Sequence, residues 1–509
     1  MISKITSCVT VGLESLPIEV EVDVSSQGLP SFAIVGLPDK AVEEAKERVR
    51  SAIRNSNFEF PGHRITVNLA PADIPKEGAT FDFPIAVGIL KASGQINYDF
   101  ENTILVGELS LDGSLKRTVG ILPVALFAKE KKLEKLFLPA VNAREAAITN
   151  YSKIFPTRSL RELFDHIVGI STIIPFNGLE IHKKAEECFL DFDMKDIKGQ
   201  EQAKRAMEIC AAGGHNIILK GPPGSGKTLL ARTLPSILPK MTMDESLETT
   251  KIYSITGLLK TDEPLITIRP FRSPHHTTSH IGLVGGGQHP RPGEISLAHR
   301  GVLFLDELAE FPRLSLEVLR QPLEDGFVSI SRARGTLCFP AKFLLVAATN
   351  PCPCGYYQDS KHQCVCSSGQ ILRYQKRISG PLLDRIDLYV EVPSVEFDKL
   401  TNDNFSPENS KNVRTRVQKA RDLQKKRLED EGLICNSEMK NKHIKKFCPL
   451  SSDCLKILRI AVSRFGLSAR SYQKIIKISR TIADLEGCLE ICPNHVSEAL
   501  QYRQKVDMQ

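Results

Sequence analysis

Residues 221–228 read Gly-Pro-Pro-Gly-Ser-Gly-Lys-Thr and fit the pattern G-x-x-x-x-G-K-[ST]. The apolar run at 216–220 predicts a strand before this loop, and residues 229–234 predict a helix after it. Glycines let successive backbone N–H groups turn toward phosphate oxygens, at a helix N-terminus whose dipole favours anions. The stretch therefore predicts a phosphate-binding loop in a parallel α/β core that begins at Ile197, against the alternative of a chance Gly-rich turn.

This loop supplies most of the residues predicted to bind a nucleotide. Lys227 would pair with the β- and γ-phosphates, and Thr228 would place its hydroxyl on Mg²⁺. The preceding backbone would cradle the phosphates, and it consists of Gly221, Pro222, Pro223, Gly224, Ser225 and Gly226.

Two further apolar runs end in polar side chains that suit the same chemistry. The run at 301–305 ends in Asp306 and Glu307 and could form a strand beside that of the loop. Asp306 would then hold Mg²⁺ through water, and Glu307 would polarise the attacking water; a surface turn is the alternative. The run at 343–349 ends in Asn350, whose amide could orient that water or could simply close a turn.

Length and composition restrict the kind of protein. The chain has 509 residues, which corresponds to about three domains. It shows no apolar run long enough for a membrane helix and no secretory signal, so a cytoplasmic protein is expected. The net charge of +7 equals the excess in 411–446, where twelve Lys and Arg face five Asp and Glu. That run could contact phosphates or form a solvated helix face.

Four segments differ in their patterning. Residues 1–142 alternate strand and helix patterns and predict an α+β domain. Residues 143–196 are interrupted by charges and predict a connecting segment, with a small subdomain as the alternative. Residues 197–396 predict the parallel α/β core, and 397–509 a linker followed by a helical domain.

A group of cysteines follows the strand that ends in Asn350. Cys352 and Cys354 are separated by nine residues from Cys364 and Cys366. Two such pairs can wrap one tetrahedral Zn²⁺, although the C-x-C spacing is tighter than usual. Reduced or redox-active thiols are the alternative. The adjacent His275 and His276 predict hydrogen bonding in a loop and not a metal site.

Longer stretches resemble the YifB/ComM family, bacterial Mg-chelatase-like AAA+ ATPases, over nearly the whole chain. The stretches that carry the resemblance are RSPHH at 272–276, PRPGEISLAHRGVLFLDEL at 290–308, NPCPCG at 350–355 and SGPLLDRID at 379–387. The resemblance implies an AAA+ core with a helical lid and ATP with Mg²⁺ as cofactors.

The resemblance also implies roles for particular residues. Asn350 matches the sensor-1 position, Arg385 the arginine finger and Arg470 the sensor-2 position. An arginine finger acts on a neighbouring subunit, so the resemblance implies a ring, expected to be a hexamer. Arg332 and Arg334, at the tip of a hairpin over 327–339, become candidates for contacts with the DNA backbone, unless the tip is merely solvated.

The N-terminal region is similar to Lon-type proteases. Thr80 stands where those proteases have a nucleophilic serine, and Leu122 stands where they have a catalytic lysine. A hydroxyl without a base is a poor nucleophile, so this domain is expected to be proteolytically inactive and to serve assembly or DNA contact.

The residues and the resemblance together predict an ATP-hydrolysing ring motor that acts on branched or single-stranded DNA. The resemblance implies that its task is helicase activity or branch migration during recombination or natural transformation. A Mg-chelatase-type ATPase that remodels a protein partner is one alternative. An ATP-dependent protease of the Lon class is the other, and Leu122 argues against it.

Overall fold

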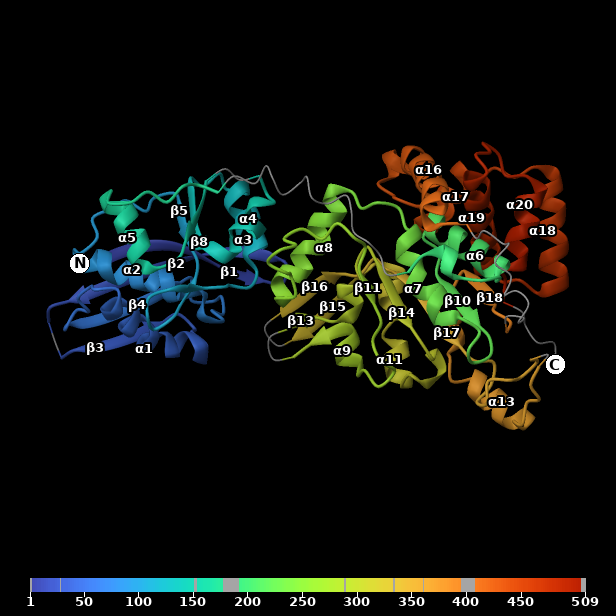
Figure 1. The fold of residues 1–509 in the computed structure, drawn as a ribbon, viewed down its shortest axis with the longest axis horizontal. Helices are drawn as coiled ribbons and strands as arrows, with labels where there is room; N and C mark the ends of the chain where they lie inside the picture. Colours follow the sequence, from blue (N-terminus) through green and yellow to red (C-terminus); the bar gives the residue numbers. More distant parts are fainter. Residues whose placement is uncertain are drawn as a thin grey trace. The chain divides into compact units, whose positions relative to one another are not determined.

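The computed structural model describes residues 2–27, 29–150, 153–176, 192–287, 290–332, 335–359, 361–394 and 408–504. The chain folds into two compact units (Figure 1). Unit 1 comprises Met1–Glu187 with Ser246–Ile266, and unit 2 comprises Cys188–Glu245 with Thr267–Gln509. None of the helices in the described ranges combines the length and the apolar character that a membrane span needs.

Unit 1 is built on a mixed seven-stranded sheet. In sheet order, its strands are β3 (Ser31–Val35), β4 (Arg64–Ala70), β2 (Glu14–Ser25), β1 (Ile2–Val11), β5 (Thr103–Leu105), β8 (Lys135–Pro139) and β9 (Ile154–Thr157). Strand β2 pairs antiparallel with both β1 and β4, whereas the remaining neighbours are parallel. The sheet and its helices confirm the predicted α+β architecture.

Helices α1 (Lys40–Asn55) and α2 (Asp82–Ala92) pack against this sheet. Helix α1 begins where the Asp39 carboxylate accepts a 2.8 Å bond from the backbone of Val42, and it buries one apolar face. Helix α2 is apolar nearly all round and is buried almost throughout. At Gly88 this helix approaches the sheet so closely that a Cβ would lie 2.6 Å from Val22 Cγ2.

The interpretation of 143–196 as a connecting segment differs from the structure over its first part. Residues 143–168 form α4 (Ala143–Ala147), the edge strand β9 and α5 (Leu160–Val168). Buried Ile154, Leu160 and Leu163 pack into the cores of unit 1. The short apolar patches between the charged residues are therefore the buried sides of short helices and of a short strand.

A segment from the middle of the sequence also belongs to unit 1. Residues Ser246–Ile266 include most of α8 (Met243–Thr256). Ser254 Oγ donates a 2.6 Å hydrogen bond to Glu145 Oε1, and the Gly120 amide donates to the Ser254 carbonyl at 3.2 Å. An insert within the sequence of unit 2 thus completes unit 1.

Unit 2 contains a five-stranded parallel sheet. In sheet order, its strands are β11 (Phe271–Arg272), β14 (Val302–Leu305), β17 (Leu344–Thr349), β10 (Ile217–Lys220) and β18 (Leu388–Glu391). All neighbours are parallel, which confirms the predicted core. The expectation that the strand ending in Asp306 lies beside that of the loop is wrong, because β17 runs between β14 and β10.

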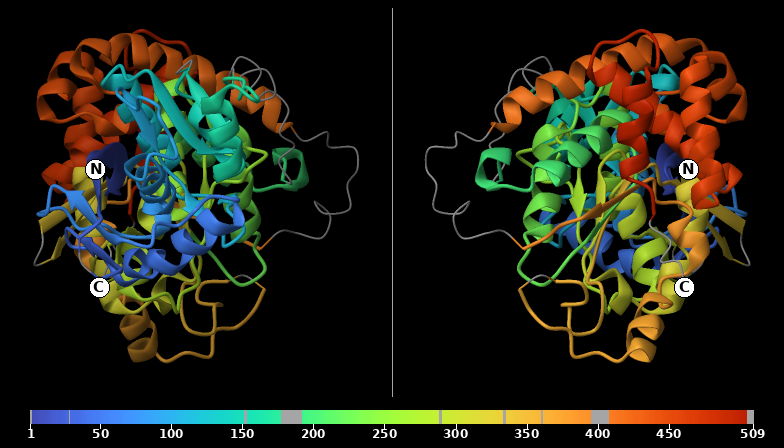
Figure 2. Two further views of the ribbon diagram at one scale, coloured as in Figure 1. Left: turned by 90° about the vertical axis from the view of Figure 1, so that its left-hand side faces the viewer. Right: turned by 90° about the vertical axis from the view of Figure 1, so that its right-hand side faces the viewer.

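The C-terminal helices form one group, drawn in orange to red in Figures 1 and 2. They are α16 (Ser410–Leu428), α17 (Asn441–Phe447), α18 (Ser452–Phe465), α19 (Ala469–Leu485) and α20 (Pro493–Gln501). Val417 and Ile482 from this group share a buried cluster with Ile209 of α6 (Glu201–Gly213). The helical lid is confirmed, and it shares a hydrophobic core with the sheet domain.

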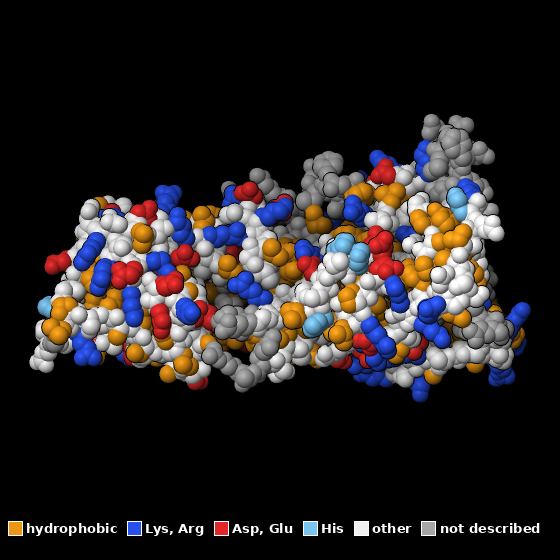
Figure 3. Space-filling model, turned by 90° about the horizontal axis from the view of Figure 1, so that it is seen from below, with side chains coloured by type: hydrophobic (Ala, Val, Ile, Leu, Met, Phe, Trp, Pro, Cys, Tyr) orange, Lys and Arg blue, Asp and Glu red, His pale blue; other side chains and the backbone are white. Residues whose placement is uncertain are grey.

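The basic run at 411–446 is largely part of this packing. Arg416 Nε lies 2.6 Å from Glu208 Oε1, and Arg427 Nη2 lies 2.6 Å from the buried Asp484 Oδ2. Arg421 donates to the carbonyl of Ala211 at 2.9 Å. Arg416 and Arg421 thus fasten the lid to α6, and Arg427 stabilises the lid itself, so the charge excess there is weak support for a phosphate-binding surface. On the face shown in Figure 3, positive and negative side chains are likewise interspersed over much of the surface.

We expect Gly88→Ala to destabilise unit 1 by about 1–3 kcal/mol, because the added methyl group collides with Val22 between helix and sheet. Calorimetry of the full chain should show a lower unfolding temperature for one transition. Gly62→Ala is the matched control, since a Cβ there meets nothing within 4 Å. Equal melting curves for both variants would contradict this packing.

Candidate nucleotide-binding site

The loop at 221–226 joins β10 to α7 (Lys227–Ile237), as the sequence predicts. Gly226 caps the helix with φ 88°, a left-handed conformation that favours glycine. A Cβ at Gly221 would lie 2.1 Å from the Val392 carbonyl oxygen beside β18. Gly226 and Gly221 are therefore required by the backbone shape of the loop, which ends at the N-terminus of α7.

Lys227 is the buried cation of this loop. Its Nζ donates to the carbonyls of Gly221 and Pro222, at 2.8 and 2.7 Å, and lies 3.3 Å from Asn350 Oδ1. Burial lowers the pKa of Lys227, and the nearby Asp306 and Glu307 oppose that shift. The structure thus brings the loop lysine together with the side chain predicted as sensor 1.

Thr228 and Asp306 meet at the end of β14. The Thr228 hydroxyl donates a 2.9 Å hydrogen bond to Asp306 Oδ2. Thr228 follows β10 and Asp306 follows β14, and β17 lies between these two strands in the sheet. A hydroxyl and a carboxylate are both hard oxygen ligands of the kind Mg²⁺ prefers. The two residues predicted to hold magnesium are therefore adjacent, and the donor set fits that ion.

Glu307 has a strained backbone and a partner that sequence reasoning did not assign. Its φ of 51° is unusual for a residue other than glycine, and strain of this kind gathers at functional sites. His276 Nδ1 lies 3.3 Å from Glu307 Oε2, whereas its neighbour His275 contacts Thr277 Oγ1 at 2.9 Å. His275 thus makes the hydrogen bond predicted for the pair, and His276 lies within ion-pair distance of the carboxylate that is predicted to be catalytic.

Arg385 and Arg470 converge on a single carboxylate that the sequence did not single out. Glu324 belongs to α12 (Arg320–Asp325), and its Oε1 lies 2.8 Å from Arg385 Nη2 and also pairs with Arg470. Burial would raise the pKa of Glu324, but the two guanidinium groups outweigh it and hold the pKa below its usual value. Within the described ranges, neither arginine forms a hydrogen bond or ion pair with the loop at 221–226.

Asn216, just before β10, anchors the backbone that carries Arg385. Its Nδ2 donates to the Arg385 carbonyl at 3.1 Å, and its Oδ1 accepts from the Leu345 amide at 2.9 Å. The backbone amide of Asn216 donates to Asp387 Oδ2 at 3.1 Å. One side chain thereby links the start of β10 to β17 and to the segment of the predicted arginine finger.

The hairpin predicted at 327–339 is present as β15 (Phe327–Arg332) and β16 (Gly335–Pro340), paired antiparallel. Arg332 ends the first strand, but its side chain is not described, and Arg334 lies outside the described residues. Their role at a DNA backbone therefore stays a prediction.

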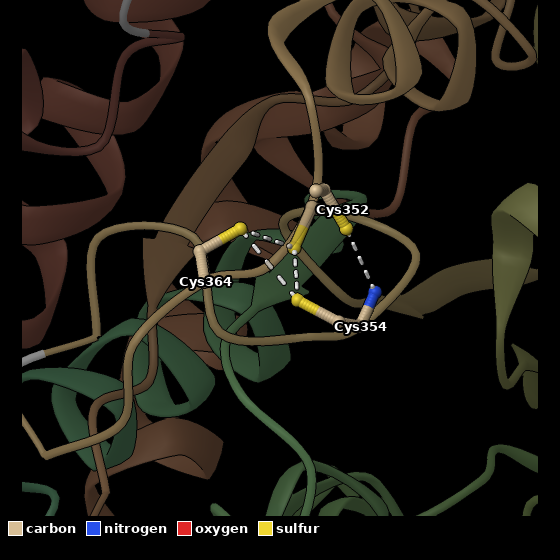
Figure 4. Close-up of side chains that lie close together, drawn as sticks. Cys352, Cys354 and Cys364 are labelled. Atoms are coloured by element: carbon tan, nitrogen blue, oxygen red, sulfur yellow. Dashed lines mark hydrogen bonds between the residues drawn. The ribbon is translucent and has the colours of Figure 1, made fainter.

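The four cysteines predicted as metal ligands come together in the structure. Cys352, Cys354, Cys364 and Cys366 place their sulfur atoms within 4.8 Å of one another. Figure 4 shows the sulfur atoms of the first three turned toward one another. The loop is thus folded into a compact thiol cluster.

The N-terminal residues compared with Lon proteases lie in unit 1. Thr80 is in a single helical turn (Ala79–Phe81), and Leu122 is buried in α3 (Ile121–Glu130). The Leu122 amide donates to Glu145 Oε1 at 3.0 Å. Leu122 is therefore part of a packed core.

Family models match most of the chain. The model described as magnesium chelatase, subunit ChlI matches residues 193–400, subunit ChlI of Mg-chelatase matches 20–142, and the ChlI C-terminal model matches 407–503. Together with the loop, the parallel sheet and the helical lid, these matches define a Mg-chelatase-like AAA+ ATPase.

Full-length relatives specify the family further. The chain is 44% identical over 503 residues to competence protein ComM of Haemophilus influenzae, covering 98% of this chain and 96% of that protein. It is 42% identical over 496 residues to YifB of Escherichia coli, covering 97% and 95%. The chain belongs to the YifB/ComM family. It is also similar to Lon protease 2 of Bacillus subtilis, at 28% identity over 145 residues, 27% of this chain and 26% of that protein.

We expect His276→Ala to lower kcat for ATP about tenfold and to leave nucleotide affinity unchanged, because a misplaced carboxylate affects the reaction more than binding. Steady-state turnover and titration with a fluorescent ATP analogue measure the two quantities. His275→Ala is the matched control, since His275 contacts Thr277 and not Glu307. Equal kcat values for the two variants would remove His276 from the site.

Proposed function

We propose that this chain is an ATP-driven ring motor that acts on DNA, in branch migration or helicase activity during recombination or natural transformation. The observation that carries the ring is the division of the catalytic groups. Lys227, Thr228 and Asp306 surround one loop, whereas Arg385 and Arg470 pair with Glu324. A pocket and a separate pair of cations suit a head-to-tail interface between copies, which closes into a ring.

In this proposal each residue has a definite task. Lys227 holds the β- and γ-phosphates, and Thr228 with Asp306 binds Mg²⁺, which neutralises phosphate charge. Glu307, oriented by His276, accepts a proton from the attacking water, while Asn350 positions that water. Arg385 of the next subunit offsets charge that develops on the γ-phosphate oxygens, with Arg470 beside it as the second cation.

Support for DNA comes from the family and from the hairpin. The Haemophilus influenzae relative is named as a competence protein, which connects it with natural transformation. In the sequence, Arg332 and Arg334 fall where β15 gives way to β16, and cations there could contact phosphates without reading sequence. Several arginines of the lid are engaged within the fold, so the hairpin is the stronger candidate.

ATP and Mg²⁺ are the cofactors of the proposed reaction. We also propose a zinc ion at the four cysteines, as a structural ion that takes no part in ATP hydrolysis. The Lon-like region of unit 1 is proposed to be proteolytically inactive, because the lysine position holds the buried Leu122. A hexameric ring is the proposed assembly.

We expect forked or three-stranded DNA to accelerate ATP hydrolysis by the wild type several-fold, and Lys227→Ala to be nearly inactive under all conditions. Released phosphate, measured with and without DNA, tests both points. A rate of ATP hydrolysis that does not change with DNA, together with a stable protein partner, would favour the Mg-chelatase-type alternative, which the family models also suggest. Lysine removal without effect would overturn the site itself.

Mixing two inactive variants tests whether the active site is shared between copies. Arg385→Ala keeps an intact pocket, and Lys227→Ala keeps an intact arginine. In a random equimolar ring, about a quarter of the interfaces would pair the two intact halves. We expect each variant alone to be nearly inactive and the mixture to recover a measurable fraction of wild-type turnover. An inactive mixture whose subunits demonstrably exchange would contradict a shared site.

A further inference from the structure

The four cysteines lie in a long loop that has no regular secondary structure in its described part. Residues 350–367 separate β17 from α13 (Ser368–Gln375) and include neither helix nor strand in their described part. Val365 is 86% exposed, and only Cys352 among the four cysteines is fully buried. A long loop without an apolar core of its own needs a cross-link to adopt one shape.

The distances between sulfur atoms match those of a single metal ion. Cys352 Sγ lies 3.3 Å from Cys354 Sγ and 3.7 Å from Cys364 Sγ, and Cys354 Sγ lies 3.6 Å from Cys364 Sγ (Figure 4). In a tetrahedral zinc site with Zn–S bonds of about 2.3 Å, neighbouring sulfur atoms stand about 3.8 Å apart. The shortest of these separations still far exceeds the S–S bond of about 2.05 Å in a disulfide.

Backbone amides support the same sulfur atoms. The Tyr357 amide donates to Cys352 Sγ at 3.3 Å, and the Cys354 amide donates to Cys366 Sγ at 3.4 Å. Hydrogen bonds from the surrounding backbone to ligand atoms orient them and tune a metal site. The cluster therefore shows both four convergent ligands and a supporting shell.

This loop lies directly against the nucleotide-binding loop. Gly355 has φ 88°, and a Cβ built on it would be 2.5 Å from Cδ of Pro223. Five residues earlier, the loop starts at Asn350, whose side chain contacts Lys227 at 3.3 Å. A constraint on the cysteine loop therefore also restrains Pro223 and Asn350 beside the phosphate-binding loop.

We infer that Cys352, Cys354, Cys364 and Cys366 bind one Zn²⁺, and that this ion braces the loop against Pro223 and so holds Asn350 and the phosphate-binding loop in register. Metal binding stands independently of the motor activity, whereas its effect on nucleotide affinity rests on the proposed function. The ion is structural, because all four positions of its tetrahedron are filled by the chain.

Mass spectrometry for metals on the purified full chain tests the first part. We expect one zinc per chain in the wild type and almost none in Cys364→Ser combined with Cys366→Ser. Cys338→Ser, which removes an exposed thiol outside the cluster, should keep its zinc. Cys366→His should also keep it, because three cysteines and one histidine form a competent zinc set. Iron in place of zinc, or a wild type without metal, would overturn the inference.

A fluorescent ADP analogue tests the second part. We expect the zinc-free double variant to bind it about tenfold more weakly than the wild type, and Cys366→His to bind it normally. Should the double variant fail to fold, zinc release from the wild type by a mercurial reagent, followed with a metal-sensitive dye, should weaken nucleotide binding in parallel. Unchanged affinity after zinc loss would overturn the brace. A zinc-loaded wild type that hydrolyses no ATP would instead refute the proposed function alone.

Discussion

The hydrogen bond between Thr228 and Asp306 connects the helix that follows the phosphate-binding loop with the end of β14. It spans β17, the intervening strand, so it can form only when three parallel strands end at the same edge of the sheet. That edge also brings Asn350 to Lys227. The candidate site therefore depends on strand order and register, since a slip of one residue in β14 or β17 would move Asp306 or Asn350 away from its partner in α7.

A second constraint is the charge balance at Glu324. One carboxylate faces two guanidinium groups, from Arg385 and Arg470, so the local excess is positive. Arg385 is mostly buried, and Asn216 holds the backbone that carries it. Both cations are thus kept on one rigid surface, where an incoming phosphate could exchange with Glu324.

Local patterns predicted the elements well and their partners poorly. The helix of α1 follows from its cap at Asp39 and its apolar spacing, and the strands of the core from continuous apolar runs. Glu324 and Asn216 carry no local signal, because their importance arises from residues far away in the sequence. His276 lay within a recognised stretch, yet its contact with Glu307 could not be inferred from two adjacent histidines.

Sequence alone determined the class of the protein, since a G-x-x-x-x-G-K-[ST] loop between a strand and a helix is a local arrangement with a local physical cause. The sequence also predicted that the four thiols lie close together, because their spacing within one loop limits how far apart they can be. Only the tertiary structure decided that β17 separates β10 from β14, and that Ser246–Ile266 completes unit 1. Strand order and the docking of an insert depend on non-local packing, which no window of neighbouring residues contains.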